Sequence, residues 1–298
     1  MTLEQLRIFL AVAEREHMTR AAEALNLTQS ATSAAIAALE AKYGAALFER
    51  VGRGIRLTEP GRLFLHEARA VLERAAAAER VLGDVADLSR GSLRLAASQT
   101  LASYWLPDKI VQFRRAYPGI ALTLAIMNSE QVIAELHEMQ ADLGFVEGRE
   151  GGDGLVSTVV GEDELYLVVA RGHPWSVSTP DEATLRAGPW VMREPGSGTR
   201  LETDLALAAL GIATAATERL ELPSNEAVRS AVAAGGGAAL LSRLVVESSL
   251  AAGDLVRVPF PHPPRNFRML RHPQRHETAA TRAFAAMLAA APSHSSSP

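Results

Sequence analysis

The hydrophobic positions of the first 43 residues recur at intervals of three and four, which is the spacing of amphipathic helices. They predict a helix over 3–16 and a shorter one over 18–25, after which residues 26–27 interrupt the pattern. Thr28 then supplies a hydroxyl that can cap a third helix over about 29–42. The pattern therefore predicts two helices joined by a very short turn, supported by a first helix.

The third helix is predicted to bury a face of small residues and to expose a polar first turn. The inward positions are Ala31, Ala35, Ala38 and Leu39, and the outward positions are Gln29, Ser30, Thr32 and Ser33. Small polar groups at the tip of the second of two closely joined helices suit the major groove of DNA. A purely structural helical hairpin is the alternative.

A hairpin is predicted over 45–58, after a helix stop at Gly44. It carries three guanidinium groups within seven residues, those of Arg50, Arg53 and Arg56. We expect Arg53, at the tight turn, to contact the DNA backbone or a minor groove. A solvated basic face without a partner is the other interpretation.

A long helix is predicted over 60–90, where apolar residues alternate at spacings of four and three. The members of this seam are Phe64, Ala68, Val71, Ala75, Ala78, Leu82 and Val85. One helix cannot bury such a seam alone, so the pattern favours a pairing helix from a second chain. An intramolecular partner is the alternative.

These residues together resemble the winged helix-turn-helix of the bacterial LysR-type transcriptional regulators. The matching positions are Thr19, Ala21, Ala22, Leu25, Thr28 to Ser33, Ile36, Leu39, Glu40, Gly44, Leu47, Phe48, Arg50, Leu57, Thr58 and Gly61. The resemblance implies a homodimer or homotetramer that binds double-stranded DNA and responds to a small-molecule effector, with RNA polymerase as a further candidate partner.

The resemblance places the DNA contacts at the start of the third helix and on the wing. The expected contact residues are Thr28, Gln29, Ser30, Ser33, Arg50 and Arg53. Gln29 can pair with an adenine edge through two hydrogen bonds, and the serines can reach phosphate or a base. Ala34 and Ala35 depart from the longer polar side chains of many relatives, which implies weaker phosphate contact or contact with a thymine methyl group.

From Leu93 onward, short apolar strands alternate with helical segments, which predicts parallel α/β sheets. We therefore predict an α/β protein with three parts: a winged helix-turn-helix domain (1–59), a linker helix (60–90) and an effector domain (91–298). The last would have two subdomains of periplasmic-binding-protein type. The first subdomain would span about 91–162 and 268–292, and the second about 163–267.

Four polar junctions are expected to face each other across the cleft between these subdomains, where strands end and helices begin. They are Ser98-Gln99-Thr100, Asn128-Ser129, Ser197-Gly198-Thr199 and Ser224-Asn225. Hydroxyls, amides and helix N-termini favour an anion, although each residue could be only a helix cap. Residues 193–200, with Ser98 to Thr100, Tyr104, Leu106 and Pro107, resemble the effector site of LysR relatives in sulfur assimilation, which suggests sulfite, sulfate or a small carboxylate.

Composition narrows the function further. Lys and Arg number 30 against 34 Asp and Glu, for a net charge of −4, so any DNA contact must be local. The absence of cysteine excludes disulfides and a peroxide-sensing thiol pair. Glu4, Arg7 and Glu14 interrupt the first apolar run, so we expect neither a signal peptide nor a membrane span, and a cytoplasmic protein.

An enzyme is the alternative class, and the sequence gives it little support. Gly196 to Gly198 lacks the Gly-Lys-Ser or Gly-Lys-Thr of a phosphate loop, and no Gly-x-Ser-x-Gly elbow occurs. Prolines interrupt the spacing of His262, His272 and His276, so we expect no metal and no cofactor. A solute-binding or metabolite-processing α/β protein would suit the C-terminal part, but the N-terminal motif argues against it.

Overall fold

The computed structural model describes residues 1–51, 54–83, 91–148, 152–213 and 217–290. The chain divides into two compact units, residues 1–82 and 83–298. None of the helices in the described ranges is long and apolar enough to span a membrane.

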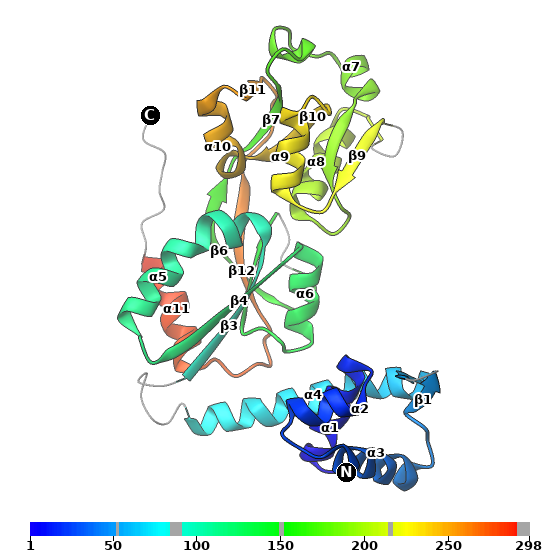
Figure 1. The fold of residues 1–298 in the computed structure, drawn as a ribbon. Helices are drawn as coiled ribbons and strands as arrows, with labels where there is room; N and C mark the ends of the chain where they lie inside the picture. Colours follow the sequence, from blue (N-terminus) through cyan, green and yellow to red (C-terminus); the bar gives the residue numbers. More distant parts are fainter. Residues whose placement is uncertain (52–53, 84–90, 149–151, 214–216, 291–298) are drawn as a thin grey trace. The chain divides into compact units, whose positions relative to one another are not determined.

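The first unit contains the predicted winged helix-turn-helix (Figure 1). Its elements are α1 (Leu3–Arg15), α2 (Met18–Ala24), α3 (Gln29–Tyr43), β1 (Phe48–Val51), β2 (Gly54–Leu57) and α4 (Glu59–Gly83). Thr2 and Gln5 form a reciprocal capping box at the start of α1, and Gly44 ends α3 in the left-handed conformation, with a φ of 66°. The strands β1 and β2 pair antiparallel, which confirms the predicted hairpin.

The buried face of α3 differs from the prediction. Thr32, Ile36 and Leu39 are buried, whereas Ala31 and Ala38 are exposed. The prediction was right for Leu39 and for Ala35, which packs against the core, and wrong for Ala31 and Ala38, because small alanines give little indication of which face is covered. Thr32 tolerates burial because its hydroxyl donates to the Thr28 carbonyl oxygen at 3.2 Å.

The beginning of α4 belongs to the core of the first unit. Phe64 packs against Phe9, with ring centroids 4.9 Å apart, and Ala68 is only 1% exposed in the same core. Phe64 and Ala68 therefore pack against residues of their own chain, which corrects their assignment to a dimer seam. Val71 is 39% exposed and Ala75 is partly buried, while the side chain of Leu82 and the predicted helix end near residue 90 lie outside the described part.

The second unit contains two five-stranded sheets. The first has the order β4-β3-β5-β12-β6, formed by β3 (Gly91–Ser98), β4 (Ile120–Met127), β5 (Leu143–Glu147), β6 (Val156–Asp163) and β12 (Arg265–Arg271). Its helices are the π-helix η1 (Leu101–Trp105), α5 (Leu106–Ala116), α6 (Ser129–His137) and α11 (Ala279–Ala290). Phe113 of α5 and Phe284 of α11 pack in the core on one face, and Val132 and Leu136 of α6 pack on the other.

The second sheet has the order β11-β7-β10-β8-β9. Its strands are β7 (Leu165–Ala170), β8 (Trp190–Arg193), β9 (Arg219–Leu222), β10 (Ala238–Ser242) and β11 (Leu255–Val258). Its helices are the 3₁₀ helix η2 (Pro174–Ser176), α7 (Glu182–Ala187), α8 (Gly198–Ala209), α9 (Asn225–Ala233) and α10 (Arg243–Ala252). Leu207 of α8 packs in the core on one face, and Val228 of α9 and Val245 of α10 pack on the other.

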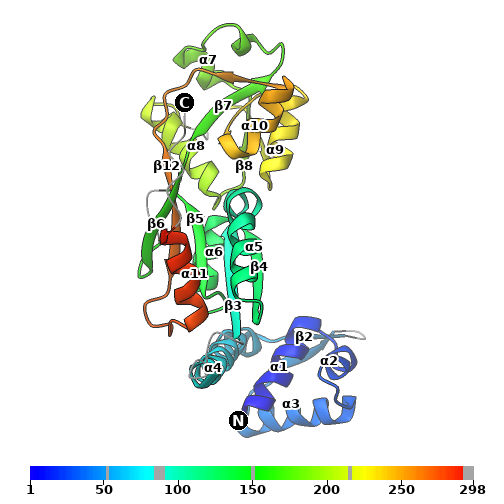
Figure 2. The ribbon, with the colours of Figure 1, turned by 90° about the vertical axis from the view of Figure 1, so that its left-hand side faces the viewer.

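Both sheets are mixed, which corrects the expectation of purely parallel strands. The chain leaves the first sheet after β6 and returns to it through β12, so β12 pairs antiparallel with both β5 and β6 (Figure 2). Likewise β7 pairs antiparallel with β10 and β11. The returning strand begins at Arg265, three residues before the predicted subdomain boundary at 268.

Candidate DNA interface and effector cleft

The N-terminal turn of α3 gathers four of the predicted DNA-contact residues. Thr28 accepts a hydrogen bond from the Ala31 amide at 3.2 Å, and its hydroxyl lies 3.0 Å from that of Ser30. Gln29 donates from Nε2 to Ser33 Oγ at 3.0 Å. Thr28, Gln29 and Ser30 are exposed and Ser33 is partly exposed, so this turn presents a compact uncharged polar surface.

The wing holds two of the three predicted arginines among the described residues, and both are exposed. Arg56 is opposite Glu49 in the hairpin, whereas Arg50 is opposite Ile55. Since opposite residues share a face and successive residues alternate, Arg50 and Arg56 project from opposite faces. The structure therefore does not group them as the sequence interpretation did. Arg53 lies outside the described residues.

In the second unit, the structure brings the four predicted polar junctions together in two pairs. Gln99 donates to the Pro223 carbonyl oxygen at 2.9 Å and accepts from the Asn225 amide at 3.0 Å. Asn225 Nδ2 also donates to Thr100 Oγ1 at 3.1 Å. These contacts join the first and fourth junctions across the cleft.

The second and third junctions meet beside the first pair. The Glu130 amide donates to the Gly196 carbonyl oxygen at 3.1 Å. A Cβ atom at Gly198 would lie only 3.0 Å from Ser129 Oγ, so the absence of a side chain allows α8 to approach α6 closely. Both cleft walls thus present helix N-termini to the same place.

The helix-cap alternative holds for only some of these residues. Asn128 and Ser224 are side-chain caps, because each accepts a hydrogen bond from an amide of the helix that follows. Ser197 occupies the cap position of α8 without making a side-chain cap bond, and its residue is 4% exposed. Ser98 Oγ is buried near the Glu147 carboxylate and makes no hydrogen bond of good geometry among the described residues. These last two hydroxyls are therefore candidates for ligand contacts.

Glu147, at the end of β5, is a candidate site residue that the sequence interpretation missed. Its carboxylate is buried, accepts from Ser129 Oγ at 3.2 Å and lies 3.7 Å from Arg265 Nη2. Burial alone would raise the pKa of Glu147, but the Arg265 charge and the nearby hydroxyls of Ser98 and Thr100 outweigh burial and hold that pKa below its ordinary value. An acidic residue ending an otherwise buried strand, LGFVE, was the available signal.

Arg265 links both walls of the cleft, because it begins the strand that returns to the first subdomain. Its Nε donates to Asp163 Oδ2 at 2.9 Å, and its Nη1 donates to Thr199 Oγ1 at 3.2 Å. Asp163 also accepts from Ser242 Oγ at 2.8 Å. One buried guanidinium thus contacts two carboxylates and a hydroxyl of α8, at the point where the chain crosses between subdomains.

A second buried arginine lies at the end of β8. Arg193 Nη1 donates to Asn225 Oδ1 and its Nε donates to Glu194 Oε2, each at 2.7 Å. The cleft is therefore a network of hydroxyls and paired charges, in which two guanidinium groups contact three carboxylates. Over the described ranges, no group of three or more His, Asp or Glu side chains is arranged to hold a metal ion.

Family models match nearly the whole chain. One described as "LysR substrate binding domain" matches residues 86–293, and one described as "Bacterial regulatory helix-turn-helix protein, lysR family" matches residues 3–62. An uncharacterised HTH-type transcriptional regulator of Escherichia coli K12, YeiE, is 36% identical over 286 residues, which cover 95% of this chain and 96% of YeiE. The HTH-type transcriptional regulator CbbR of Rhodospirillum rubrum is 34% identical over 256 residues, covering 85% of this chain and 84% of CbbR.

Solved structures share the fold. Full-length CbnR complexed with its target DNA aligns with a TM-score of 0.71 at 24% identity, covering 97% of this chain and 99% of CbnR. The regulatory domain of Synechocystis PCC6803 CcmR, solved in complex with 2-PG, aligns with a TM-score of 0.59 at 27% identity, covering 67% of this chain and 96% of that domain. The protein therefore belongs to the LysR family of DNA-binding transcriptional regulators with a C-terminal effector-binding domain.

Proposed function

We propose that the cleft binds a small oxyanion that still carries a proton. The observation that carries this proposal is the buried Glu147 carboxylate, which stands among hydroxyls and helix N-termini that would otherwise suit any anion. A fully ionised anion would be repelled by that carboxylate. An oxyanion with one O–H can donate to Glu147 in place of Ser129, whose hydroxyl is then free to donate to the oxyanion together with the hydroxyls of Ser98 and Ser197.

This chemistry separates ligands of similar size. Sulfite, carbonate and phosphate are partly protonated near neutral pH, whereas sulfate is fully ionised. The proposal therefore narrows the expected small anions to those that keep a hydrogen-bond donor. The complex of a related regulatory domain with 2-PG supports a small-molecule site in a domain of this kind.

A thermal-shift comparison of sulfite and sulfate tests the ligand class. A ligand at one hundred times its dissociation constant stabilises the native state by about 2.7 kcal/mol, so sulfite, hydrogencarbonate or phosphate should raise the melting temperature. Ser129→Ala should abolish the rise, while Ser248→Ala, on the exposed surface of α10, should leave it intact. Equal stabilisation by sulfate would contradict the protonated-oxyanion proposal, and Glu147→Gln should admit sulfate.

On the DNA side, the proposed readout uses Gln29, Ser30 and Ser33 in the major groove, with Thr28 holding the turn. The wing arginines Arg50 and Arg53 would contact the backbone or minor groove. The exposed polar turn of α3 and the membership of the LysR family support these proposed DNA contacts. Binding of the effector would favour one arrangement of the two subdomains. That arrangement would change how the paired DNA-binding domains contact and bend the operator. The change in DNA bending would alter the access of RNA polymerase to the promoter in the cytoplasm.

The proposed assembly is a homodimer or homotetramer that pairs α4 through its remaining exposed seam. Phe64 and Ala68 pack inside the chain, so a second α4 would cover the remaining described seam positions, Val71, Ala75 and Ala78. Val71→Glu should shift the sedimentation coefficient toward a smaller species, because it places a charge in an apolar seam. Val177→Glu, at a side chain 90% exposed in the second unit, is the matched control and should leave assembly unchanged. An unshifted Val71→Glu protein would contradict this seam.

A further inference from the structure

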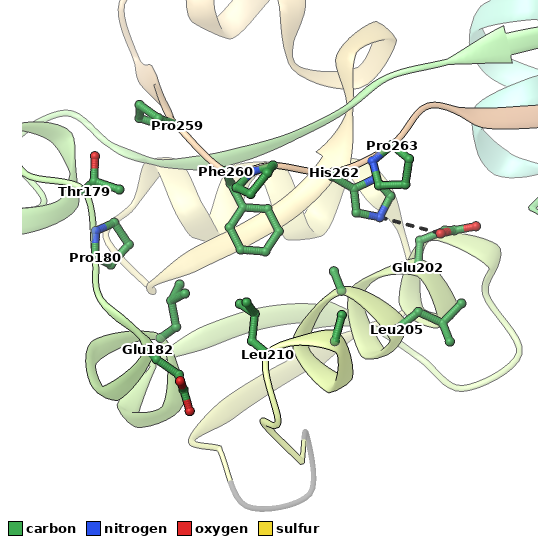
Figure 3. A pocket seen from close by; sticks show the side chains of 14 residues that line it. Thr179, Pro180, Glu182, Glu202, Leu205, Leu210, Pro259, Phe260, His262 and Pro263 are labelled. Atoms are coloured by element: carbon green, nitrogen blue, oxygen red, sulfur yellow. Dashed lines mark ion pairs between the residues drawn. The ribbon is translucent and has the colours of Figure 1, made fainter.

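A pocket of about 420 Å³ lies in the second subdomain, outside the effector cleft (Figure 3). Its walls are α8, α7 with the two residues 179–180 before it, and the segment 259–263 between β11 and β12. Most of the lining is apolar, including Leu205, Ala206, Leu210 and Phe260. No residue predicted for effector binding lines it.

One end of the pocket carries a buried polar pair. The side chains of His262 and Glu202 are 4% and 3% exposed, and His262 Nε2 lies 3.6 Å from Glu202 Oε2. Figure 3 shows this pair at one end and Thr179, Pro180 and Glu182 at the other. His262 Nδ1 is buried and has no hydrogen-bond partner in the described part of the chain. A buried polar atom without a partner is costly, so this end is incompletely satisfied without another group.

We propose that this pocket is a second small-molecule site, for a neutral and largely apolar molecule that carries one hydroxyl group. Its volume lies within the range of small-molecule sites, roughly 300 to 1,000 Å³. An apolar lining disfavours a charged ligand, and the carboxylates of Glu182 and Glu202 disfavour an anion in particular. A hydroxyl accepts from His262 Nδ1 and donates to the carboxylate of Glu202, and the rest of the molecule covers the apolar wall.

The pocket walls continue into the effector cleft, which connects the two sites physically. Glu202 lies on α8 one turn after Thr199, and Pro263 precedes Arg265 by two residues. Arg265 and Thr199 are joined by the 3.2 Å hydrogen bond of the cleft. A molecule between α8 and the segment 259–263 therefore contacts α8, which carries Thr199, and the residues that lead directly into Arg265.

Saturation-transfer NMR on the full-length protein tests the site with 4-methylphenol as the probe. Ala209 is exposed on α8 and lines the pocket, so Ala209→Trp should fill its mouth and reduce the 4-methylphenol signal at least fivefold. Ala208→Trp adds the same side chain at the neighbouring exposed position, which does not line the pocket, and should retain the signal. Melting curves of both variants establish that each is folded.

Three comparison probes, 4-methylanisole, 4-methylbenzoate and 4-methylbenzylamine, test the ligand class. 4-Methylanisole carries a methoxy group in place of the hydroxyl, and 4-methylbenzoate carries a carboxylate there. Each should give a signal severalfold weaker than that of 4-methylphenol. Glu202→Gln should narrow the preference for 4-methylphenol over 4-methylanisole. Equal signals from the two tryptophan variants would overturn the site, and stronger binding of 4-methylbenzoate or 4-methylbenzylamine would overturn the neutral-hydroxyl class. Neither DNA nor a cleft oxyanion is present, so failure here leaves the proposed effector chemistry untouched.

Discussion

The tip of α3 and the effector cleft are both rich in hydroxyl and amide groups, but they are built differently. At the tip, Thr28, Gln29, Ser30 and Ser33 lie within six consecutive positions and bond to one another at the surface. In the cleft, the Asn225 amide bonds to Gln99, 126 residues away, and the charges of Glu147 and Arg265 are buried. The tip can therefore form from one helix end, whereas the cleft requires both subdomains to be folded.

This difference sets how each region should respond to substitution. Apart from Thr28, which caps α3, a side chain at the tip can be removed without leaving a buried group unpaired, so only DNA binding should suffer. Removing a charge from the cleft leaves its partner buried and uncompensated, so stability should suffer as well. Substitutions at the tip other than those of Thr28 should therefore weaken DNA binding alone, whereas substitutions in the cleft should also destabilise the fold.

The largest effect is expected for Arg265→Gln. This change leaves the Glu147 and Asp163 carboxylates buried without their shared cation and removes the bond to Thr199. Breaking a buried ion pair costs about 3 to 5 kcal/mol, which urea unfolding of the second unit should report. Arg56→Gln removes an exposed arginine and should leave that transition within about 0.5 kcal/mol of wild type.

A double variant distinguishes charge from packing. Asp163→Asn combined with Arg265→Gln removes a carboxylate along with the cation, so it should recover part of the lost stability. No recovery would mean that Arg265 acts through shape rather than through charge.

Sequence reasoning succeeded where local pattern decides structure and failed where distant segments decide it. The helix-turn-helix, the wing and the two-subdomain order follow from caps, turns and periodicity close in sequence. The buried face of α3 was predicted only in part because Ala31 and Ala38 are compatible with either face. Ala68 was assigned to a dimer because a heptad seam does not identify its partner. Glu147 was missed because its role depends on Arg265, which lies on a strand that returns from the other subdomain.

At the tip, Gln29→Ala is expected to weaken operator binding by about 1 to 3 kcal/mol without changing stability. The side chain is exposed and contacts only Ser33 within its own helix, so the fold loses little. Affinity for an operator selected from random DNA should fall, while affinity for unrelated DNA at the same salt concentration should not. Equal losses on both DNAs would assign Gln29 to the phosphate backbone.

The pH dependence of stability offers a smaller effect, specific to the cleft. The pKa of Glu147 is held below its unfolded value of about 4.3, so the unfolded state binds this proton more readily. Its contribution is complete above the unfolded pKa and is lost as the pH falls through the lowered folded value. Urea unfolding below pH 5 should therefore show a flatter pH dependence for Glu147→Gln than for wild type. Parallel curves would mean that other carboxylates dominate this range.

The smallest expected effect separates the two faces of the wing. Arg50 and Arg56 project from opposite faces of the hairpin, and a phosphate contact changes the logarithmic salt dependence of DNA affinity by about 1. If Arg50 contacts phosphate as proposed, Arg50→Ala should flatten the slope by that amount and weaken binding to all sequences, whereas Arg56→Ala should leave the slope unchanged. Affinities measured between low and physiological salt provide the test. A change in slope for both variants would require DNA to contact both faces, and a change for Arg56 alone would reverse the side of the wing that faces DNA.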